Sequence, residues 1–245
     1  MKIRLDELVV SRGLAPTRTA AQHLIMGGKV RVRNCAAPKA GNKYAPDIGI
    51  ELVAPDRFVG RGGGKLEGAF AHFGFSVEGL DCLDVGASTG GFTDCLLQHG
   101  AARVCAVDVG RGQLHPKLLG DPRVTNIEEF NCRNLTRADL PFTPSFAVCD
   151  VSFISLRLIL PPIAAVLAPG GGIVTLVKPQ FEAGRGQVGK GGVVRDPSVR
   201  ENVVNDIRRF GESVLGLEWA GVCESPITGP KGNVEYTAYW KVKPV

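Results

Sequence analysis

The sequence lacks the cysteine patterns of zinc-binding and disulfide-rich proteins. Its seven cysteines form no Cys-x-x-Cys pair, their number is odd, and several lie inside apolar runs. We therefore expect reduced core cysteines in a cytoplasmic protein, with no metal site and no disulfide frame.

Long hydrophobic runs are also missing. The most apolar region, residues 156–177, is interrupted by Pro161, Pro162, Pro169 and three glycines. The N-terminus carries charges where a signal peptide needs an apolar stretch. We expect neither an exported protein nor a membrane-spanning segment.

The remaining composition is that of a globular α/β protein. A length of 245 residues predicts one domain with an appendage, or two unequal domains. With 44% apolar and 22% charged residues, the chain can bury a core. Its 32 glycines show no three-residue period, which excludes a collagen-like structure and indicates tight turns.

Positive charge is concentrated at the front of the chain. Residues 1–65 hold twelve Lys and Arg against five Asp and Glu, whereas residues 66–245 hold seventeen against nineteen. Such a front segment is typical of polyanion binding, because neutralised phosphates release counterions. A merely solvated basic face is the alternative.

The front segment also has a recognisable pattern of elements. Leu5, Leu8 and Val9 recur at helical spacing, and Thr17 is a plausible N-cap of a second helix. Residues 29–34 then alternate charged residues with valine, which predicts a strand with one buried face. Arg18, Gln22 and Lys29 are expected to point outward.

These residues resemble the S4 RNA-binding module, through Arg4-Leu5-Asp6, Ser11-Arg12-Gly13, Thr17-Arg18 and Gly28-Lys29-Val30. The resemblance implies binding of structured RNA through the second helix. The side chains expected to contact RNA are Arg4, Arg12, Arg18, Gln22, Lys29 and Arg31. A small DNA-binding helical unit is the alternative.

A boundary is expected near residue 60. Residues 55–64 form a predicted linker with a glycine-rich hinge, and residues 65–73 resume helical spacing. We therefore predict an RNA-binding domain over residues 1–59 and a second domain over residues 60–245.

The second domain alternates short apolar strands with helical patterns. The expected strands are residues 82–85, 104–107, 124–127, 146–148 and 173–177. This alternation predicts a parallel, doubly wound sheet, whose ligands bind at the carboxyl ends of the strands.

The first of these strands ends in a loop of small residues, and the second ends at Asp108, which can bind the ribose of an adenosine. Both S-adenosylmethionine and NAD enzymes share this layout. The loop lacks the second glycine of Gly-x-Gly-x-x-Gly, and the carboxylate of Asp84 suits a methionine ammonium better than a pyrophosphate. The residues expected to bind S-adenosylmethionine are Asp84, Gly86, Ser88, Gly90, Gly91, Phe92, Asp108, Glu128 and Asn131. Of Glu128, Glu129 and Asn131, one is expected to contact the cofactor.

Two other motifs point to functions that their context excludes. Residues 86–90 match the Gly-x-Ser-x-Gly elbow of hydrolases, but no histidine follows the third strand. Residues 184–191 resemble a P-loop, but Gly191 replaces the Ser or Thr that binds magnesium. This second segment is expected to be a mobile basic loop over the site, or a plain surface connection.

Four separated residues complete the pattern. Asp150 and Lys178 close the fourth and fifth strands, and each alone could form a structural salt bridge. In the order Lys65, Asp150, Lys178, Glu235 they match the tetrad of FtsJ-type ribose 2′-O-methyltransferases. The segments 61–66, 84–92, 150–153, 178–182 and 232–235 resemble the TlyA family of haemolysin-like rRNA methyltransferases, which carry an S4 module in front.

The resemblance implies a Rossmann-like α/β methyltransferase domain with a mostly parallel, seven-stranded sheet, preceded by a small α+β S4 domain. It implies S-adenosylmethionine as cofactor, ribosomal RNA (16S, 23S or both) and ribosomal subunits as partners, and no membrane. Lys178 would be the base, made neutral by burial and by the cation of Lys65, while Asp150 and Glu235 would orient the lysines and the hydroxyl. A ribosome-binding factor without turnover and a membrane-lytic haemolysin are the alternatives.

Overall fold

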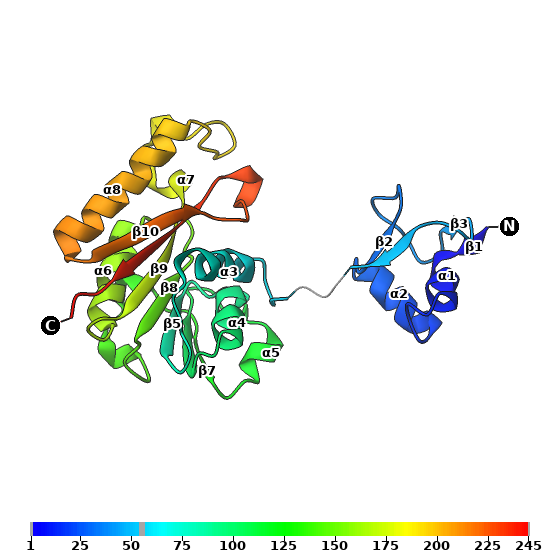
Figure 1. Cartoon of the computed structure of the whole chain (residues 1–245), viewed down its shortest axis with the longest axis horizontal. Coiled ribbons are helices and arrows are strands. Elements are labelled where there is room, and N and C mark those ends of the chain that lie inside the picture. Colours follow the sequence, from blue (N-terminus) through cyan, green and yellow to red (C-terminus); the bar gives the residue numbers. More distant parts are fainter. Residues whose placement is uncertain (1, 54–56, 245) are drawn as a thin grey trace. The chain divides into compact units, whose positions relative to one another are not determined.

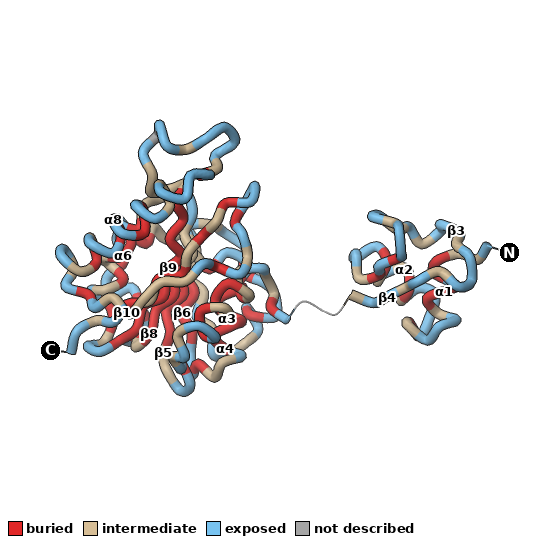
Figure 2. Tube along the Cα trace, turned by 45° about the horizontal axis from the view of Figure 1, so that its top comes forward, coloured by how far each residue is buried: buried red, intermediate tan, exposed pale blue. Residues whose placement is uncertain are grey.

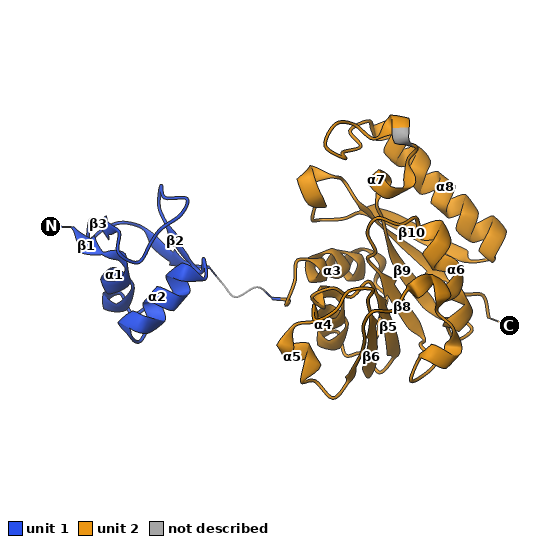
Figure 3. Ribbon diagram, turned by 180° about the vertical axis from the view of Figure 1, so that it is seen from behind, with its two compact units in different colours: residues 1–57 blue, residues 58–245 orange. Residues whose placement is uncertain are grey.

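The computed structural model describes residues 2–53 and 57–244. The chain divides into two compact units, residues 1–57 and 58–245 (Figure 3). The functional boundary that we place after residue 59 stays a prediction. Pro55 and Asp56 of the expected linker lie outside the described residues.

The first unit is a small α+β structure. Its elements are β1 (Ile3–Arg4), α1 (Leu5–Ser11), α2 (Arg18–Met26), β2 (Val30–Val32), β3 (Lys43–Tyr44) and β4 (Ile50–Leu52). Strands β1 and β3 pair antiparallel, as do β2 and β4. The predicted N-cap is present, since Thr17 Oγ1 accepts a hydrogen bond of 3.2 Å from the backbone N–H of Ala20. Apolar residues from both helices and from β2 form the core of this unit.

The second unit is built on a seven-stranded sheet (Figure 1). The strand order is β10-β11-β9-β8-β5-β6-β7. Five strands run parallel and match the predicted ones: β5 (Asp81–Val85), β6 (Arg103–Val107), β7 (Val124–Ile127), β8 (Phe146–Cys149) and β9 (Gly172–Val177). The antiparallel strands β10 (Glu218–Glu224) and β11 (Tyr236–Lys241) extend the sheet beyond β9. The predicted fold class is confirmed.

Alternating residues of the central strands pack on opposite faces of the sheet. Leu83 and Val85 belong to a core with helices α6 (Leu156–Val166) and α8 (Pro197–Leu215). Cys82 belongs to a second core with α3 (Gly62–Phe73) and α4 (Gly91–Gln98). Figure 2 shows the buried strands between these layers. The remaining helical elements are short: α5 (Pro116–Leu119), α7 (Pro179–Glu182), η1 (Cys132–Asn134), η2 (Arg137–Asp139), η3 (Arg185–Gln187) and η4 (Pro230–Gly232).

The glycine-rich hinge expected before residue 65 is wrong. Helix α3 already begins at Gly62, so Gly62, Gly63 and Gly64 form its first turn. A Cβ on Gly63 would lie 2.3 Å from Cγ of Phe58, and one on Gly64 would lie 2.7 Å from Cδ1 of Ile227. These glycines therefore permit close packing and do not mark a flexible joint.

The apolar region of residues 156–177 forms helix α6 followed by strand β9. Within the described residues, no helix has both the length and the apolar character needed to cross a membrane.

Candidate active site

The loop after β5 brings its backbone close to the neighbouring strand end. Gly86 and Gly90 have positive φ angles of 82° and 91°, which favour glycine. A Cβ on Gly86 would lie 2.9 Å from the carbonyl oxygen of Asp150. Ser88 also has a positive φ, of 48°. The loop therefore leaves open the space above the end of the sheet.

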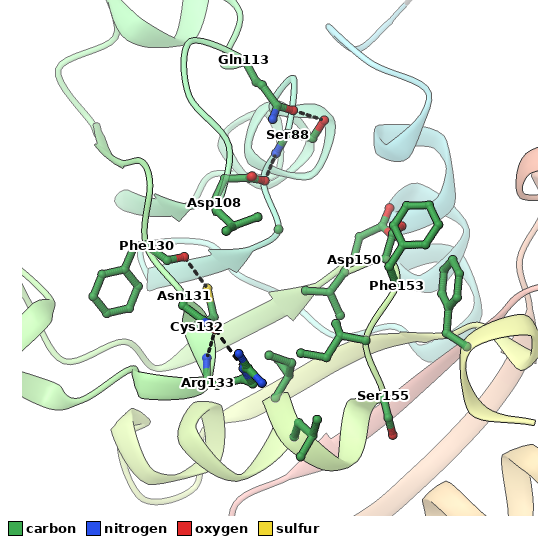
Figure 4. A pocket seen from close by; sticks show the side chains of 18 residues that line it. Ser88, Asp108, Gln113, Phe130, Asn131, Cys132, Arg133, Asp150, Phe153 and Ser155 are labelled. Carbon is green, nitrogen blue, oxygen red and sulfur yellow. Dashed lines mark hydrogen bonds between the residues drawn. The ribbon is translucent and has the colours of Figure 1, made fainter.

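A cavity of about 980 Å³ opens beside this loop (Figure 4). Asp108 lines it from the end of β6 and accepts hydrogen bonds from the backbone N–H groups of Ser88 (2.8 Å) and Gly110 (2.7 Å). Asp150 lines the same cavity from the end of β8. The volume lies within the range of small-molecule sites, about 300–1,000 Å³.

The other residues predicted to bind the cofactor fall into three groups, according to which cavity they line. Gly86, Ser88 and Asn131 line this large cavity. Gly91 and Phe92 line an adjoining cavity of about 280 Å³. Asp84, Gly90 and Glu128 line neither of these two cavities.

Asp84 lies beneath the loop and is fully buried. Its Oδ2 accepts a hydrogen bond of 2.6 Å from Thr93, and its Oδ1 has no hydrogen-bond partner among the described residues. Burial raises the pKa of this carboxyl to about 7, with the Thr93 hydrogen bond opposing the rise. A buried carboxylate oxygen without a partner is a suitable acceptor for a donor group of a ligand.

The three polar residues after β7 differ in their contacts. Asn131 lines the large cavity and caps η1, where its Oδ1 accepts a hydrogen bond of 3.2 Å from the N–H of Arg133. Glu128 accepts a hydrogen bond of 2.9 Å from the N–H of Gly112. Glu129 has a positive φ of 55° and its N–H donates to Gly110. Asn131 is therefore the best placed of the three to contact a ligand.

The four predicted catalytic residues come together at the carboxyl edge of the sheet. Lys178 Nζ lies 2.5 Å from Oδ1 of Asp150, and Lys65 Nζ lies 3.8 Å from Oδ2 of the same residue. Lys65 also donates a hydrogen bond of 2.6 Å to Glu235. The side chains of Lys65, Lys178 and Glu235 are only 10%, 7% and 0% exposed. The result is one continuous chain of two ammonium groups and two carboxylates.

Two further residues join this cluster, and neither was assigned a role from the sequence. Ser152 accepts a hydrogen bond of 2.9 Å from Lys178, and Gln180 donates one of 3.2 Å to Glu235. Each lies two residues after a predicted catalytic residue. Both also lie inside segments that resemble the family, 150–153 and 178–182, and that resemblance is the signal that could have identified them.

An aromatic pair stands at the mouth of the large cavity. Phe153 is 90% exposed, has a positive φ of 63°, and its ring lies 5.0 Å from that of Phe181. Both residues line the cavity. An exposed phenylalanine with this backbone conformation is typical of functional sites.

The segment that resembles a P-loop is attached to the turn before Glu235. Lys231 Nζ donates to the carbonyl oxygen of Gly191 (3.0 Å), and Asn233 Nδ2 donates to that of Gly192 (2.9 Å). Asn233 is buried and also accepts from the N–H of Val194. These bonds anchor the C-terminal end of the segment to that turn, and the mobility expected of the rest of the segment stays a prediction.

In the first unit, three of the predicted RNA-binding side chains contact one carboxylate. Arg4, Arg18 and Gln22 all donate hydrogen bonds to Asp6. The expected outward orientation is therefore incomplete for Arg18 and wrong for Gln22, which is half-buried. The remaining three residues are Lys29, which is half-buried, and Arg12 and Arg31, which are exposed.

Outside this edge, Glu67, Cys95 and His99 place one possible metal-ligand atom each within 4.8 Å of one another. His99 Nε2 and Glu67 Oε2 are 2.7 Å apart. Two tetrahedral ligands of one zinc ion would be about 3.3 Å apart. The group is therefore arranged as a hydrogen-bonded pair beside a buried thiol.

Comparison with known proteins gives matches over both units. The FtsJ-like methyltransferase family matches residues 58–241, and the S4 domain matches residues 3–32. Hemolysin A of Brachyspira hyodysenteriae is 46% identical over 240 residues, which cover 97% of this chain and 99% of that protein. A protein of Mycobacterium tuberculosis named 16S/23S rRNA (cytidine-2′-O)-methyltransferase TlyA is 45% identical over 237 residues, covering 96% of this chain and 88% of that protein.

A solved structure of a Streptococcus thermophilus protein that bears the hemolysin name is 44% identical, with a TM-score of 0.76. The match covers 99% of this chain and 89% of that one. These similarities confirm the family that the sequence motifs predicted. The chain is an enzyme of the FtsJ-like methyltransferase family with an S4 domain in front, and it belongs with the TlyA proteins.

Proposed function

We propose that this protein methylates a ribose 2′-hydroxyl of ribosomal RNA, with S-adenosylmethionine as the methyl donor. The observation that carries the proposal is the buried chain formed by Lys178, Asp150, Lys65 and Glu235. Asp150 lines the large cavity, and together with both lysines it also lines the adjoining cavity of about 280 Å³. The name of the Mycobacterium tuberculosis relative makes cytidines of 16S and 23S rRNA the first substrates to test.

The cavity fits the proposed cofactor. The fold and the family of the protein imply S-adenosylmethionine as cofactor, which would supply a methyl group bound to a positively charged sulfur. Asp108 would accept hydrogen bonds from the ribose hydroxyls, because two backbone N–H groups use only two of the lone pairs of its carboxylate. Asn131, which lines the cavity, would contact the adenine.

Lys178 is the residue that we assign as the acceptor of the hydroxyl proton. In this step the ribose O–H bond breaks and an N–H bond forms on Lys178. Lys178 is held in an ion pair, so it must give up a proton before it can accept the proton of the hydroxyl. Oδ1 of Asp150, at 2.5 Å, is within reach to accept the proton that Lys178 gives up. Ser152, at 2.9 Å, fixes the direction of the amine.

Lys65 and Glu235 hold the other end of the chain. The ammonium group of Lys65 faces Asp150, and an ion pair of 2.6 Å with the buried carboxylate of Glu235 holds it in place. Removing one member would leave a buried charge without its partner, which is strongly unfavourable. The two acids therefore orient the two lysines, as the family resemblance implies.

The aromatic pair supports an RNA substrate. Unpaired bases that leave the RNA helix stack on exposed aromatic rings. Phe153 presents such a ring where the cavity that contains Asp150 opens, and the half-buried ring of Phe181 lies beside it. A base that stacks there would bring its own ribose toward Lys178.

The test is substitution of the proposed base. Lys178→Ala should lower methyl transfer to bacterial 30S and 50S subunits by about 100- to 10,000-fold at saturating RNA, while calorimetry shows retained cofactor binding. Lys241→Ala, an exposed lysine at the end of β11, is the control for loss of one positive charge. Near-normal turnover of Lys178→Ala would exclude the assignment. A wild-type protein that binds subunits but transfers no methyl group would favour the binding factor without turnover.

A further inference from the structure

The buried carboxylate of Asp6 collects the polar side chains of the first unit. Its Oδ1 accepts hydrogen bonds of 3.0 Å from Nε of Arg4 and from the N–H of Glu7. Its Oδ2 accepts bonds from Nη2 of Arg4 (2.9 Å), Nε of Arg18 (3.0 Å) and Nε2 of Gln22 (2.9 Å). The side chain of Asp6 is 0% exposed.

Burial of a carboxylate is unfavourable unless it is paired and hydrogen-bonded. Asp6 meets both conditions, and its hydrogen bonds with Arg4 hold the pKa of its carboxyl well below the usual range. The group is therefore a fixed anion. A fixed anion in contact with two flexible arginines restricts their orientation.

The arginines remain accessible although they are bound. The side chains of Arg4 and Arg18 are 35% and 51% exposed. Within the described residues, Nη1 of Arg4 and Nη2 of Arg18 make no hydrogen bond. Each guanidinium thus binds Asp6 through one edge and leaves N–H donors on another edge available to a ligand. The planar arrangement of these donors suits phosphate oxygens.

The cluster of Arg4, Arg18, Asp6 and Glu7 has no net positive charge that would attract RNA. Asp6 neutralises one arginine, and Glu7, whose Oε1 lies 3.6 Å from Nη1 of Arg18, offsets the other. The four formal charges sum to zero, so any advantage for binding comes from orientation. A side chain that is held in place before binding loses less conformational entropy on binding.

We propose that Asp6 is a positioning residue for RNA binding, which fixes Arg4 and Arg18 as a preformed pair of phosphate-binding guanidinium groups. This inference rests on the proposed function. It has an unusual consequence, because removing a negative charge from the RNA-binding face should weaken the binding of a polyanion.

The experiment measures the affinity of the full chain for bacterial 30S and 50S ribosomal subunits over a series of salt concentrations. Asp6→Asn should bind about tenfold more weakly or worse, and the slope of log K against log salt should become shallower by about one to two units. Glu7→Gln removes the same charge from the neighbouring, exposed position. It should bind as tightly as the wild type or more tightly.

Because Asp6→Asn could unfold the first unit, Arg18→Lys provides a second test. Lysine keeps the positive charge but cannot bind Asp6 and a phosphate through two edges of one plane, so we expect clearly weaker binding. Wild-type affinity of Arg18→Lys, or of a folded Asp6→Asn, would overturn the inference. The double variant Arg4→Ala/Arg18→Ala separates the two proposals. If the double variant binds as tightly as the wild type, the assignment of this RNA-binding face fails. If the double variant binds weakly while Asp6→Asn and Arg18→Lys bind as the wild type does, only the role of Asp6 fails.

Discussion

At the scale of single residues, Asp150 is the side chain that connects the two lysines of the candidate site. It contacts Lys178 at 2.5 Å and Lys65 at 3.8 Å from its two oxygens. Its backbone is also close to the loop after β5, where a Cβ on Gly86 would lie 2.9 Å from its carbonyl oxygen. Asp150 therefore lies where the proposed cofactor cavity and the lysine cluster meet.

Asp84 makes the stability of the cofactor-free protein depend on pH. Burial raises its pKa to about 7 from an ordinary value of 3.8. Between these values the folded protein holds a proton that the unfolded chain has lost, so this contribution to stability is complete below pH of about 4 and is lost as the pH rises to about 7. The loss is on the order of several kcal/mol.

Asp84→Asn should remove this dependence, because the amide does not titrate. Urea unfolding at pH 5 and pH 8 measures it. The wild type should lose more stability than the variant between the two pH values, and the variant should be the more stable of the two at pH 8. An identical decrease in both proteins would show that Asp84 does not hold a proton in the folded state.

At the scale of secondary structure, the first turn of α3 illustrates how packing overrides helix propensity. Glycine is about 1 kcal/mol less favourable than alanine inside a helix, yet three glycines begin this helix. Phe58 and Ile227 occupy the space that side chains would need. The turn therefore approaches its neighbours closely, and it places Lys65 in the buried cluster.

Gly63→Ala should destabilise the protein by about 1–2 kcal/mol, because the overpacking of Phe58, about 1–3 kcal/mol, exceeds the gain in propensity. Thermal unfolding measures the effect. Ala71→Gly is the matched control, since Ala71 is exposed on the same helix and should lose about 1 kcal/mol through propensity alone. If Gly63→Ala stabilises the protein, propensity governs this turn and the packing argument is wrong.

At the scale of the whole molecule, the two units divide the chemistry between them. Residues 1–57 hold ten Lys and Arg against five Asp and Glu, whereas residues 58–245 hold nineteen of each and contain the cavity and the lysine cluster. We therefore expect RNA affinity and cofactor affinity to respond to different substitutions.

The double variant Arg12→Ala/Arg31→Ala tests this division. Loss of two phosphate-binding charges should raise the KM for ribosomal subunits several-fold and make the salt dependence of binding shallower by about one to two units. The kcat at saturating RNA and the Kd for S-adenosylmethionine should not change. A parallel loss of cofactor affinity would mean that the front unit supports the fold of the second.

Local sequence pattern was sufficient to predict the five parallel strands and to single out the four proposed catalytic residues. Strands β5 to β9 are short, strongly apolar and bounded by turn residues, so local pattern is sufficient to predict them. Asp150 and Lys178 were identified because each follows a strand end, and Lys65 and Glu235 because all four residues match the order of the family tetrad. Strands β10 and β11 were not located from the sequence. The residues of β10 are half-exposed and mixed, and the two strands form by pairing with each other and, through β11, with β9.

The contacts of these residues depend on the tertiary structure. It buried Asp84 beneath its loop, gave Ser152 and Gln180 contacts with the lysine cluster, and placed Arg4, Arg18 and Gln22 around Asp6. These contacts join positions up to 55 residues apart, as between Gln180 and Glu235. Local pattern reports which face of an element is buried, whereas the partner of a buried polar group depends on how distant segments meet in space.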